Sequence, residues 1–252
     1  NMMSLVFGLS ADGFVAIGIT LILISGLIDL SVGSVQCLSA VIVGYLYTRG
    51  TNIWLASLIA LVCCALCGLI TGVLVAKLNN LAPFIITLAM QGLIRGLCYI
   101  LTQGTSVTVV GDKIADFRYL GGGYLSGIPV FFLLLIVAIV IMQFLLKNTK
   151  YCAKVFFIGS NVKAAELAGI NVIRTKISLY ITSALFAAMA GVLCVGRFGV
   201  SSPILGLSAE SRAITAAVVG GTSMRGGEGS IANTLIGLFL IHFISNSLIQ
   251  RG

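Results

Sequence analysis

The chain has 252 residues, of which 59% are apolar and 9% carry a charged side chain. Soluble globular domains have about a quarter charged residues, so this composition excludes that class and indicates a protein that resides in a lipid bilayer. The formal net charge of +8 does not require nucleic acid as a partner, because lysines and arginines retained in cytoplasmic loops give a membrane protein the same excess.

Apolar runs, free of charged residues except for Arg95 in one of them, divide the chain into candidate membrane segments, since a helix needs about 20 apolar residues to cross a bilayer core of about 30 Å. These runs are residues 13–28, 30–48, 52–76, 84–101, 130–146, 177–196 and 231–248. With one shorter helix described below, they predict an all-α, polytopic transmembrane helix bundle of about eight segments. Both ends of the chain look truncated, and one further helix at each end would give about ten.

Asp29 and Ser31 lie between the first two segments. The carboxylate of Asp29 could accept hydrogen bonds from Ser31 and from a following backbone N–H, which would cap the next helix. Alternatively, it could face a polar passage through the membrane. We favour the first interpretation and predict that both are structural turn or cap residues.

Arg95 lies in the middle of the segment 84–101. An arginine at that depth is energetically costly and should face protein or water rather than lipid. It is either a pathway residue or the structural partner of a neighbouring helix, and the sequence leaves both open. Thr87, Gln91, Arg95 and Glu210 are our candidates for a substrate pathway.

Residues 147–176 carry six of the 15 lysines and arginines of the chain and a single acid. This excess between two apolar segments is typical of a cytoplasmic loop. The assignment also places Lys77 and Arg225 on the cytoplasmic side. It places residues 103–129, residues 201–212 and both ends of the chain on the external side.

A short helix with both ends marked is predicted within this loop. Ser160 or Asn161 can cap its first free N–H groups, and Gly169 can adopt the left-handed conformation that ends it. Its alanines, whose methyl groups would share one face and allow another backbone to approach, are Ala164, Ala165 and Ala168. The helix is therefore predicted to dock on a partner, and the alternative is a loop helix that packs on its own protein.

A second interruption comes late in the chain. Residues 213–219 are apolar but too short to span a bilayer, and the glycine-rich stretch 220–230 follows them. This pattern predicts a broken or re-entrant helix that is buried in protein or lines a cavity, with Gly220 and Gly221 as structural turn residues. Glu210 precedes the short helix, where the helix dipole favours an acid.

The sequence contains few residues that could form a catalytic site. The glycine-rich stretch lacks the Gly-Lys-Ser/Thr of a phosphate loop, and His242 is the single histidine, alone in an apolar run. Six of the seven cysteines lie in apolar stretches, so we expect neither disulfides nor a metal site. We predict no catalytic residue and a transport protein rather than an enzyme. An ion-driven secondary transporter and a membrane-embedded enzyme are the rival hypotheses.

Several motifs taken together resemble the ribose-type sugar permease subunits of bacterial ABC importers. They occur in the order of that family and span nearly the whole chain. The motifs are residues 28–34, residues 83–88 with Arg95 and Gly96, residues 158–165 with residues 169–172, and residues 217–223 with residues 226–230.

The resemblance implies a single transmembrane permease domain over residues 1–252, in the bacterial inner membrane, with residues 147–176 as its cytoplasmic coupling loop. It implies a monosaccharide or similar solute, a second permease subunit that is identical or related, a periplasmic binding protein and two ATP-binding subunits. ATP and magnesium would bind to those subunits, and this chain would bind no cofactor. The residues that would couple to the ATPase are Asn161, Lys163, Ala164, Ala165, Glu166, Ala168 and Gly169.

Two departures from the family pattern stand out. Family members usually read Glu-Leu-Asp-Ala-Ile where this chain reads Glu210-Ser211-Arg212-Ala213-Ile214, so a base stands in place of an acid. A milder change is Cys152-Ala153-Lys154 where Phe/Tyr-Gly-Arg is common. The first change puts in doubt any role that depends on negative charge at position 212.

Overall fold

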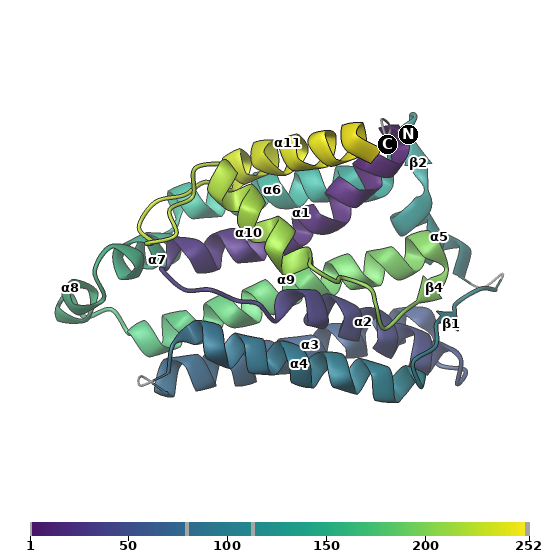
Figure 1. Cartoon of the computed structure of the whole chain (residues 1–252), viewed down its shortest axis with the longest axis horizontal. Helices are drawn as coiled ribbons and strands as arrows, with labels where there is room; N and C mark the ends of the chain where they lie inside the picture. Colours follow the sequence, from purple (N-terminus) through teal and green to yellow (C-terminus); the bar gives the residue numbers. More distant parts are fainter. Residues whose placement is uncertain (1, 79–80, 112–113, 250–252) are drawn as a thin grey trace.

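The computed structural model describes residues 2–78, 81–111 and 114–249 and consists of packed helices (Figure 1). The long helices are α1 (Met2–Ile24), α2 (Val32–Tyr47), α3 (Ile53–Lys77), α4 (Pro83–Thr102), α6 (Val130–Asn148), α9 (Val172–Phe198) and α11 (Ile231–Ile249). The short helices are α5 (Ala115–Gly122), α7 (Lys150–Ser160), α8 (Val162–Leu167) and α10 (Ala209–Val219). Two short antiparallel strand pairs join β1 (Val107–Thr108) to β4 (Val200–Ser201), and β2 (Tyr124–Leu125) to β3 (Ile128–Pro129).

Within the described residues, six helices are long and apolar enough to cross a membrane: α1, α3, α4, α6, α9 and α11. The helix α2 is apolar but shorter, and α10, with 11 residues, is only about 16 Å long at 1.5 Å per residue. Each of the eight predicted segments therefore corresponds to one helix. The prediction of a polytopic helical membrane protein with a broken element near its C-terminal end is confirmed.

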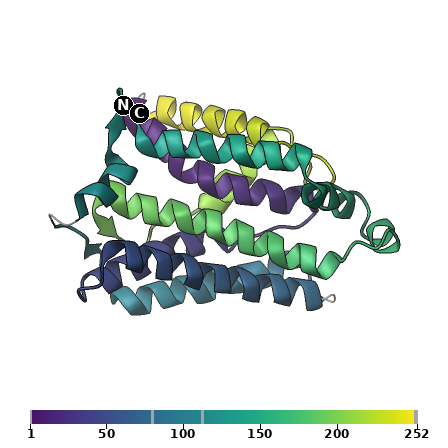
Figure 2. The ribbon, with the colours of Figure 1, turned by 180° about the vertical axis from the view of Figure 1, so that it is seen from behind.

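The helices form layers around α9. This helix packs on α1, α2 and α3, and α10 packs on α1 and α11. Figure 2 shows the green α9 running between the pair α3 and α4 on one side and the group α1, α6 and α11 on the other. Most residues of α1 and α9 are buried, whereas α3, α4, α6 and α11 each bury fewer than half of theirs. The exposed apolar surface of the bundle therefore belongs mostly to these four outer helices.

The two ends of the bundle differ as the charge pattern predicts. α8 lies at one end, and the strand pairs and both ends of the chain lie at the other (Figure 1). The turn at Gly26 and the loop before α11 come together at the α8 end, because the N–H of Gly227 donates to the carbonyl of Ile24 at 2.8 Å. The predicted cytoplasmic and external segments thus separate to opposite ends.

Several predicted boundaries are wrong, most of them for one reason. The first segment was expected over 13–28, but α1 covers Met2–Ile24 and includes Asp12. The last short helix was expected from Ala213, but α10 begins at Ala209 and includes Glu210 and Arg212. In both places a charged residue was taken as the limit of a membrane segment, although the two side chains, Asp12 and Arg212, pair with each other.

The basic loop is also more helical than predicted. Its first part forms α7, which the sequence analysis did not predict, and its last residues, from Val172 on, belong to α9. Residues 201–212 are not a simple external loop, because the chain turns from β4 through residues 203–208 directly into α10.

Candidate functional site

The four candidate pathway residues come from two helices that the fold brings together. Thr87, Gln91 and Arg95 are spaced by four residues and so lie on one face of α4. That face is turned inward: Thr87 is fully buried and the other two are partly buried. The hydroxyl of Thr87 donates to the carbonyl of Phe84 at 3.2 Å, within its own helix.

Gln91 contacts Glu210 directly. The Gln91 Nε2 donates to Glu210 Oε1 at 3.0 Å, which links α4 to the first turn of α10. Glu210 is only 7% exposed, and its second oxygen, Oε2, has no hydrogen-bond partner within the described chain. The hydroxyl of Ser34 in α2 donates to the Gln91 carbonyl at 2.9 Å. Three segments distant in sequence therefore meet at one polar position.

Gly33 makes this meeting possible. A Cβ at this position in α2 would collide with Glu210 Oε2 and with the carbonyl oxygen of Gly206. Only glycine lets the carboxylate lie directly over the backbone of α2. The same stretch carries the motif Val32-Gly33-Ser34, so its glycine has a packing role here.

Arg95 holds the irregular backbone that leads into α10. Its Nη1 donates to the carbonyl of Pro203 at 2.9 Å and to that of Leu205 at 2.7 Å. Non-helical backbone at membrane depth is tolerated only where its polar groups are satisfied by protein or water. Of the two roles left open by the sequence, the structural pairing is therefore present in the fold.

Three buried polar atoms around this position have spare hydrogen-bonding capacity. Glu210 Oε2, Gln36 Oε1 and Arg95 Nη2 are each buried without a partner among the described residues. Gln36, which is 2% exposed, lies beside Gly206 and was missed by the sequence analysis. Two acceptors and one donor suit a hydroxyl group, which both donates and accepts.

The predicted turn residues make hydrogen bonds within the protein. Asp29 Oδ1 accepts from the Ser31 N–H at 2.9 Å and from its hydroxyl at 2.6 Å, and Ser183 of α9 donates to Oδ2 at 3.3 Å. Gly220 caps the end of α10, and Gly221 has a φ of 88°. Both carboxylate oxygens of Asp29 are used by the fold, which favours the turn over the passage.

At the end of the bundle that is predicted to be cytoplasmic, α8 has the caps that the sequence indicates. Asn161 Oδ1 accepts from the N–H of Ala164 at 3.0 Å, whereas Ser160 donates to Phe156 within α7. Gly169 follows the helix with a φ of 77°. Asn161 is therefore the capping residue of the two candidates.

The alanines at α8 were predicted to share one docking face, but they differ in exposure. Ala165 is 0% exposed and packs against Ile158 and Val172 of its own chain, whereas Ala164 and Ala168 are exposed. The most exposed large apolar side chain of the loop is Leu167, at 91%, which was not among the predicted coupling residues.

The loop is joined to the bundle by backbone contacts at Gly159. A Cβ on this residue of α7 would collide with the carbonyl oxygen of Ile24 and with the backbone nitrogen of Gly227. The Gly227 N–H itself donates to that carbonyl. The end of α1, the end of α7 and the loop before α11 are thus in direct backbone contact.

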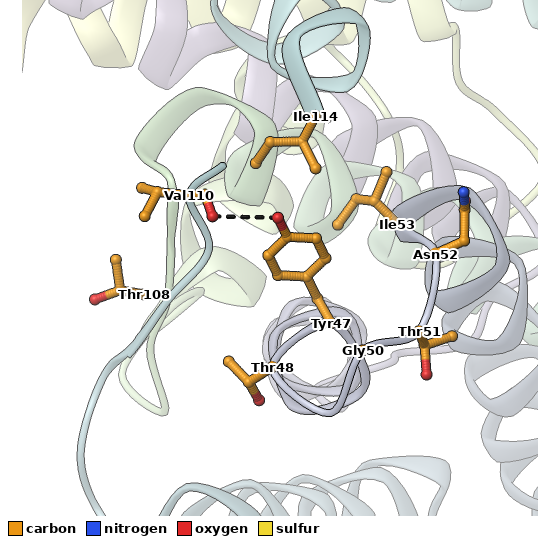
Figure 3. A pocket seen from close by; sticks show the side chains of 9 residues that line it. All are labelled: Tyr47, Thr48, Gly50, Thr51, Asn52, Ile53, Thr108, Val110 and Ile114. Carbon is orange, nitrogen blue, oxygen red and sulfur yellow. Dashed lines mark hydrogen bonds between the residues drawn. The ribbon is translucent and has the colours of Figure 1, made fainter. Parts of the chain in front are cut away.

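The opposite end, predicted to be external, carries an open hollow of about 640 Å³ between the connection from α2 to α3 and the segment after β1 (Figure 3). Tyr47 lies across it and donates to the Val110 carbonyl at 3.1 Å. Its polar lining is Tyr47, Thr48, Thr51, Asn52 and Thr108. This hollow was not predicted from the sequence.

Comparison with known proteins decides the family. Residues 2–251 match the sequence model of the family described as branched-chain amino acid transport system / permease component. The chain belongs to this permease family. No solved structure matches the chain significantly.

Several relatives are named as sugar import permeases. The ribose import permease protein RbsC of Bacillus subtilis (strain 168) is 38% identical over 98% of this chain and 76% of its own length. The protein of the same name from Escherichia coli (strain K12) is 34% identical over 98% and 77%. The fructose import permease protein FrcC of Rhizobium meliloti is 34% identical over 95% and 68%.

These findings confirm the resemblance that the motifs indicated. The chain is a multi-pass permease component of an ABC transporter of the bacterial inner membrane. They do not favour the ion-driven transporter or the membrane enzyme. The roles of the individual site residues stay predictions.

Proposed function

We propose that this chain is the membrane-spanning permease subunit of an ATP-driven importer for a monosaccharide or a similarly small polar solute delivered by a periplasmic binding protein. The relatives named for ribose and fructose support this solute class. The observation that carries the proposal is the buried contact between Gln91 and Glu210, beside which three polar atoms are left without partners. A solute rich in hydroxyl groups matches such a site.

The proposed assembly contains a second permease subunit, identical or related, and two ATP-binding subunits. ATP and magnesium bind to those subunits, and this chain binds no cofactor and hydrolyses no ATP. The glycine-rich stretch 220–230 supports this division, because it contains no lysine and so lacks the Gly-Lys-Ser/Thr sequence of a phosphate loop. Its backbone instead contacts other parts of the chain.

Residues 161–169 carry the coupling in this proposal. Their exposed surface includes Lys163, Glu166 and Leu167. The buried Ala165 holds the short helix against the rest of the chain. A displacement of α8 by the ATPase moves α7, and the backbone contacts at Gly159 transfer that movement to the end of α1 and the loop before α11. Alternating access then requires two packings of similar energy.

The movement reaches the polar site through α10. The loop contacted by Gly159 lies between α10 and α11, and α10 carries Glu210 in its first turn. A shift of α10 separates Glu210 from Gln91 or brings them together, which exposes or closes the proposed pathway. The two predicted groups of site residues thus belong to one mechanism.

Leu167→Asp is expected to weaken binding of the ATP-binding subunit about tenfold or more, because a side chain of this size is worth about 1.5–3 kcal/mol when buried in an interface. The measurement is co-purification of the complete permease with the ATP-binding subunit after both are solubilised in detergent. Leu125→Asp is the matched control, since Leu125 is exposed at the external end. Retention of the ATP-binding subunit by Leu167→Asp would contradict the coupling role of α8.

Glu210→Gln is expected to lower uptake about tenfold, because a hydrogen bond to a charged acceptor exceeds a neutral one by about 1.4 kcal/mol. Uptake of labelled D-ribose, L-arabinose and D-fructose is measured with the assembled transporter and its binding protein in proteoliposomes. Asp116→Asn, an exposed acid of α5, is the control. Uptake equal to that of the unchanged protein would remove Glu210 from the pathway, and uptake of none of the three sugars by the unchanged protein would contradict the proposed solute class.

A further inference from the structure

Three ionisable side chains from different helices, none of which takes part in the Gln91–Glu210 contact, meet between α1, α10 and α11. Asp12 lies in the middle of α1, Arg212 in the first turn of α10 and His242 in the middle of α11. Asp12 is only 4% exposed. These residues are up to 230 positions apart in sequence, so only the fold brings them together.

Their geometry is that of a paired charge. Arg212 Nε lies 2.6 Å from Asp12 Oδ2 and Arg212 Nη2 lies 2.9 Å from Asp12 Oδ1, which makes the pair bidentate. His242 Nε2 lies 3.0 Å from the same Oδ2, and it donates, because a carboxylate oxygen accepts. Gly8, one turn before Asp12, leaves room for the ring: a Cβ there would approach His242 Cε1 to 3.2 Å.

The cluster holds the same irregular backbone as Arg95, from the other side. Arg212 Nη1 donates to the carbonyl of Leu207 at 3.0 Å, whereas Arg95 binds the carbonyls of Pro203 and Leu205. Arg212 is two positions after Glu210 in the same turn of α10. The start of α10 is thus fixed between α1 and α11 through Arg212 and against α4 through Glu210.

We propose that the Asp12–Arg212–His242 cluster is a positioning device that sets the place of α10, and thereby the contact of Glu210 with Gln91, without touching the solute. The inference rests on the proposed function only in giving Glu210 its role. An unpaired carboxylate inside a membrane bundle is costly, so Asp12 binds Arg212 wherever α10 allows it. The base at position 212, an acid in the family pattern, has its partner in Asp12.

Disulfide formation between Gln91→Cys and Glu210→Cys in membranes tests this inference without requiring transport. Thiols that have formed a disulfide no longer react with a maleimide, so the loss of maleimide labelling measures the disulfide yield. Labelling of each single cysteine variant gives the background from the seven native cysteines. We expect Asp12→Asn and Arg212→Gln each to lower the yield about threefold, the size of a contact coupling of about 0.7 kcal/mol. Ser211→Ala, on the exposed side of the same turn, should leave it unchanged.

An exchange of the two charges separates positioning from general stability. Arg212→Asp puts two acids together and should give the lowest yield, and the double variant Arg212→Asp with Asp12→Arg should restore most of it. A yield unchanged by Asp12→Asn and Arg212→Gln, or a folded charge-exchanged protein without recovery, would overturn the proposal. If Arg212→Asp does not fold, the disulfide yields of Asp12→Asn and His242→Phe test the proposal instead. An unchanged yield in both variants would overturn the proposal.

The same cysteine pair keeps this inference separate from the proposed function. A transporter that takes up none of the three sugars would contradict the solute class, while the dependence of the disulfide yield on Asp12 would still stand. Conversely, normal sugar uptake together with a disulfide yield that does not depend on Asp12 would support the importer assignment and overturn the positioning role.

Discussion

Gly159→Ala is expected to lower the free energy of unfolding by about 2–4 kcal/mol, and to lower sugar uptake more than it lowers binding of the ATP-binding subunit. The added methyl group collides with two backbone atoms, the carbonyl oxygen of Ile24 and the nitrogen of Gly227. Backbone atoms cannot turn away as a side chain can, and overpacking of this kind costs about 1–3 kcal/mol. Separating the two segments also breaks the hydrogen bond from Gly227 to Ile24, which adds about 1 kcal/mol.

The functional effect follows from where the contact lies. α8 is outside the contact, so its exposed surface can still bind the ATP-binding subunit, whereas its movement no longer reaches α1 and the loop before α11. The measurements are thermal unfolding in detergent, ATP hydrolysis by the assembled transporter and sugar uptake. Hydrolysis that persists while uptake is lost is the expected result.

Gly92→Ala is the matched control for Gly159→Ala. Gly92 is also helical, but apart from its chain neighbours and the nearby backbone of its own helix, no atom of the described chain lies within 4 Å of the place that its Cβ would take. An alanine in such a helix position is favoured over glycine by about 0.5–1 kcal/mol. If both alanine variants destabilised the subunit equally, the effect would come from the loss of glycine in general, and the junction at Gly159 would lose its special role.

The membrane helices could be predicted from the sequence because their signal is local. An apolar run of about 20 residues specifies a spanning helix wherever its neighbours lie, so each predicted segment has its helix. The caps of α8 were predicted for the same reason, since Asn161 and Gly169 act on the backbone within a few positions of themselves.

Pairings between distant residues could not be predicted in this way. The first membrane segment was predicted to begin just after Asp12, and Arg212 was an unexplained departure from the family pattern. The structure shows that these two residues pair with each other. A charge is excluded from a membrane helix only when it is unpaired, and one sequence does not show which charges pair across 200 positions. His242 was judged isolated for the same reason.

The error at Ala165 has a different origin. Its spacing with Ala164 and Ala168 defines a face of α8, but spacing does not say whether that face meets a partner or the chain itself. Packing against Ile158 and Val172 resolves this in favour of the chain itself for Ala165. Leu167 was overlooked because a leucine in an apolar protein carries no signal until its exposure is known.

Arg95→Met is expected to lower the free energy of unfolding by about 3 kcal/mol, since each of its two hydrogen bonds from a charged donor is worth about 1.5–3 kcal/mol and the carbonyls of Pro203 and Leu205 lose their partner. Removing a costly buried charge offsets part of this loss. Arg95→Lys keeps the charge but not the planar fork of donors, so it should lose about half as much.

Thermal unfolding of the subunit in detergent measures these effects, with Arg49→Met as the control. Arg49 is exposed beyond the end of α2, over the ring of Tyr45, and an exposed cation–π contact is worth about 0.5–1 kcal/mol. Equal stability of Arg95→Met and the unchanged protein would mean that the irregular backbone before α10 does not depend on Arg95. The expected loss would show instead that this arginine is retained inside the bundle because it makes a non-helical segment possible at the depth where Glu210 meets Gln91.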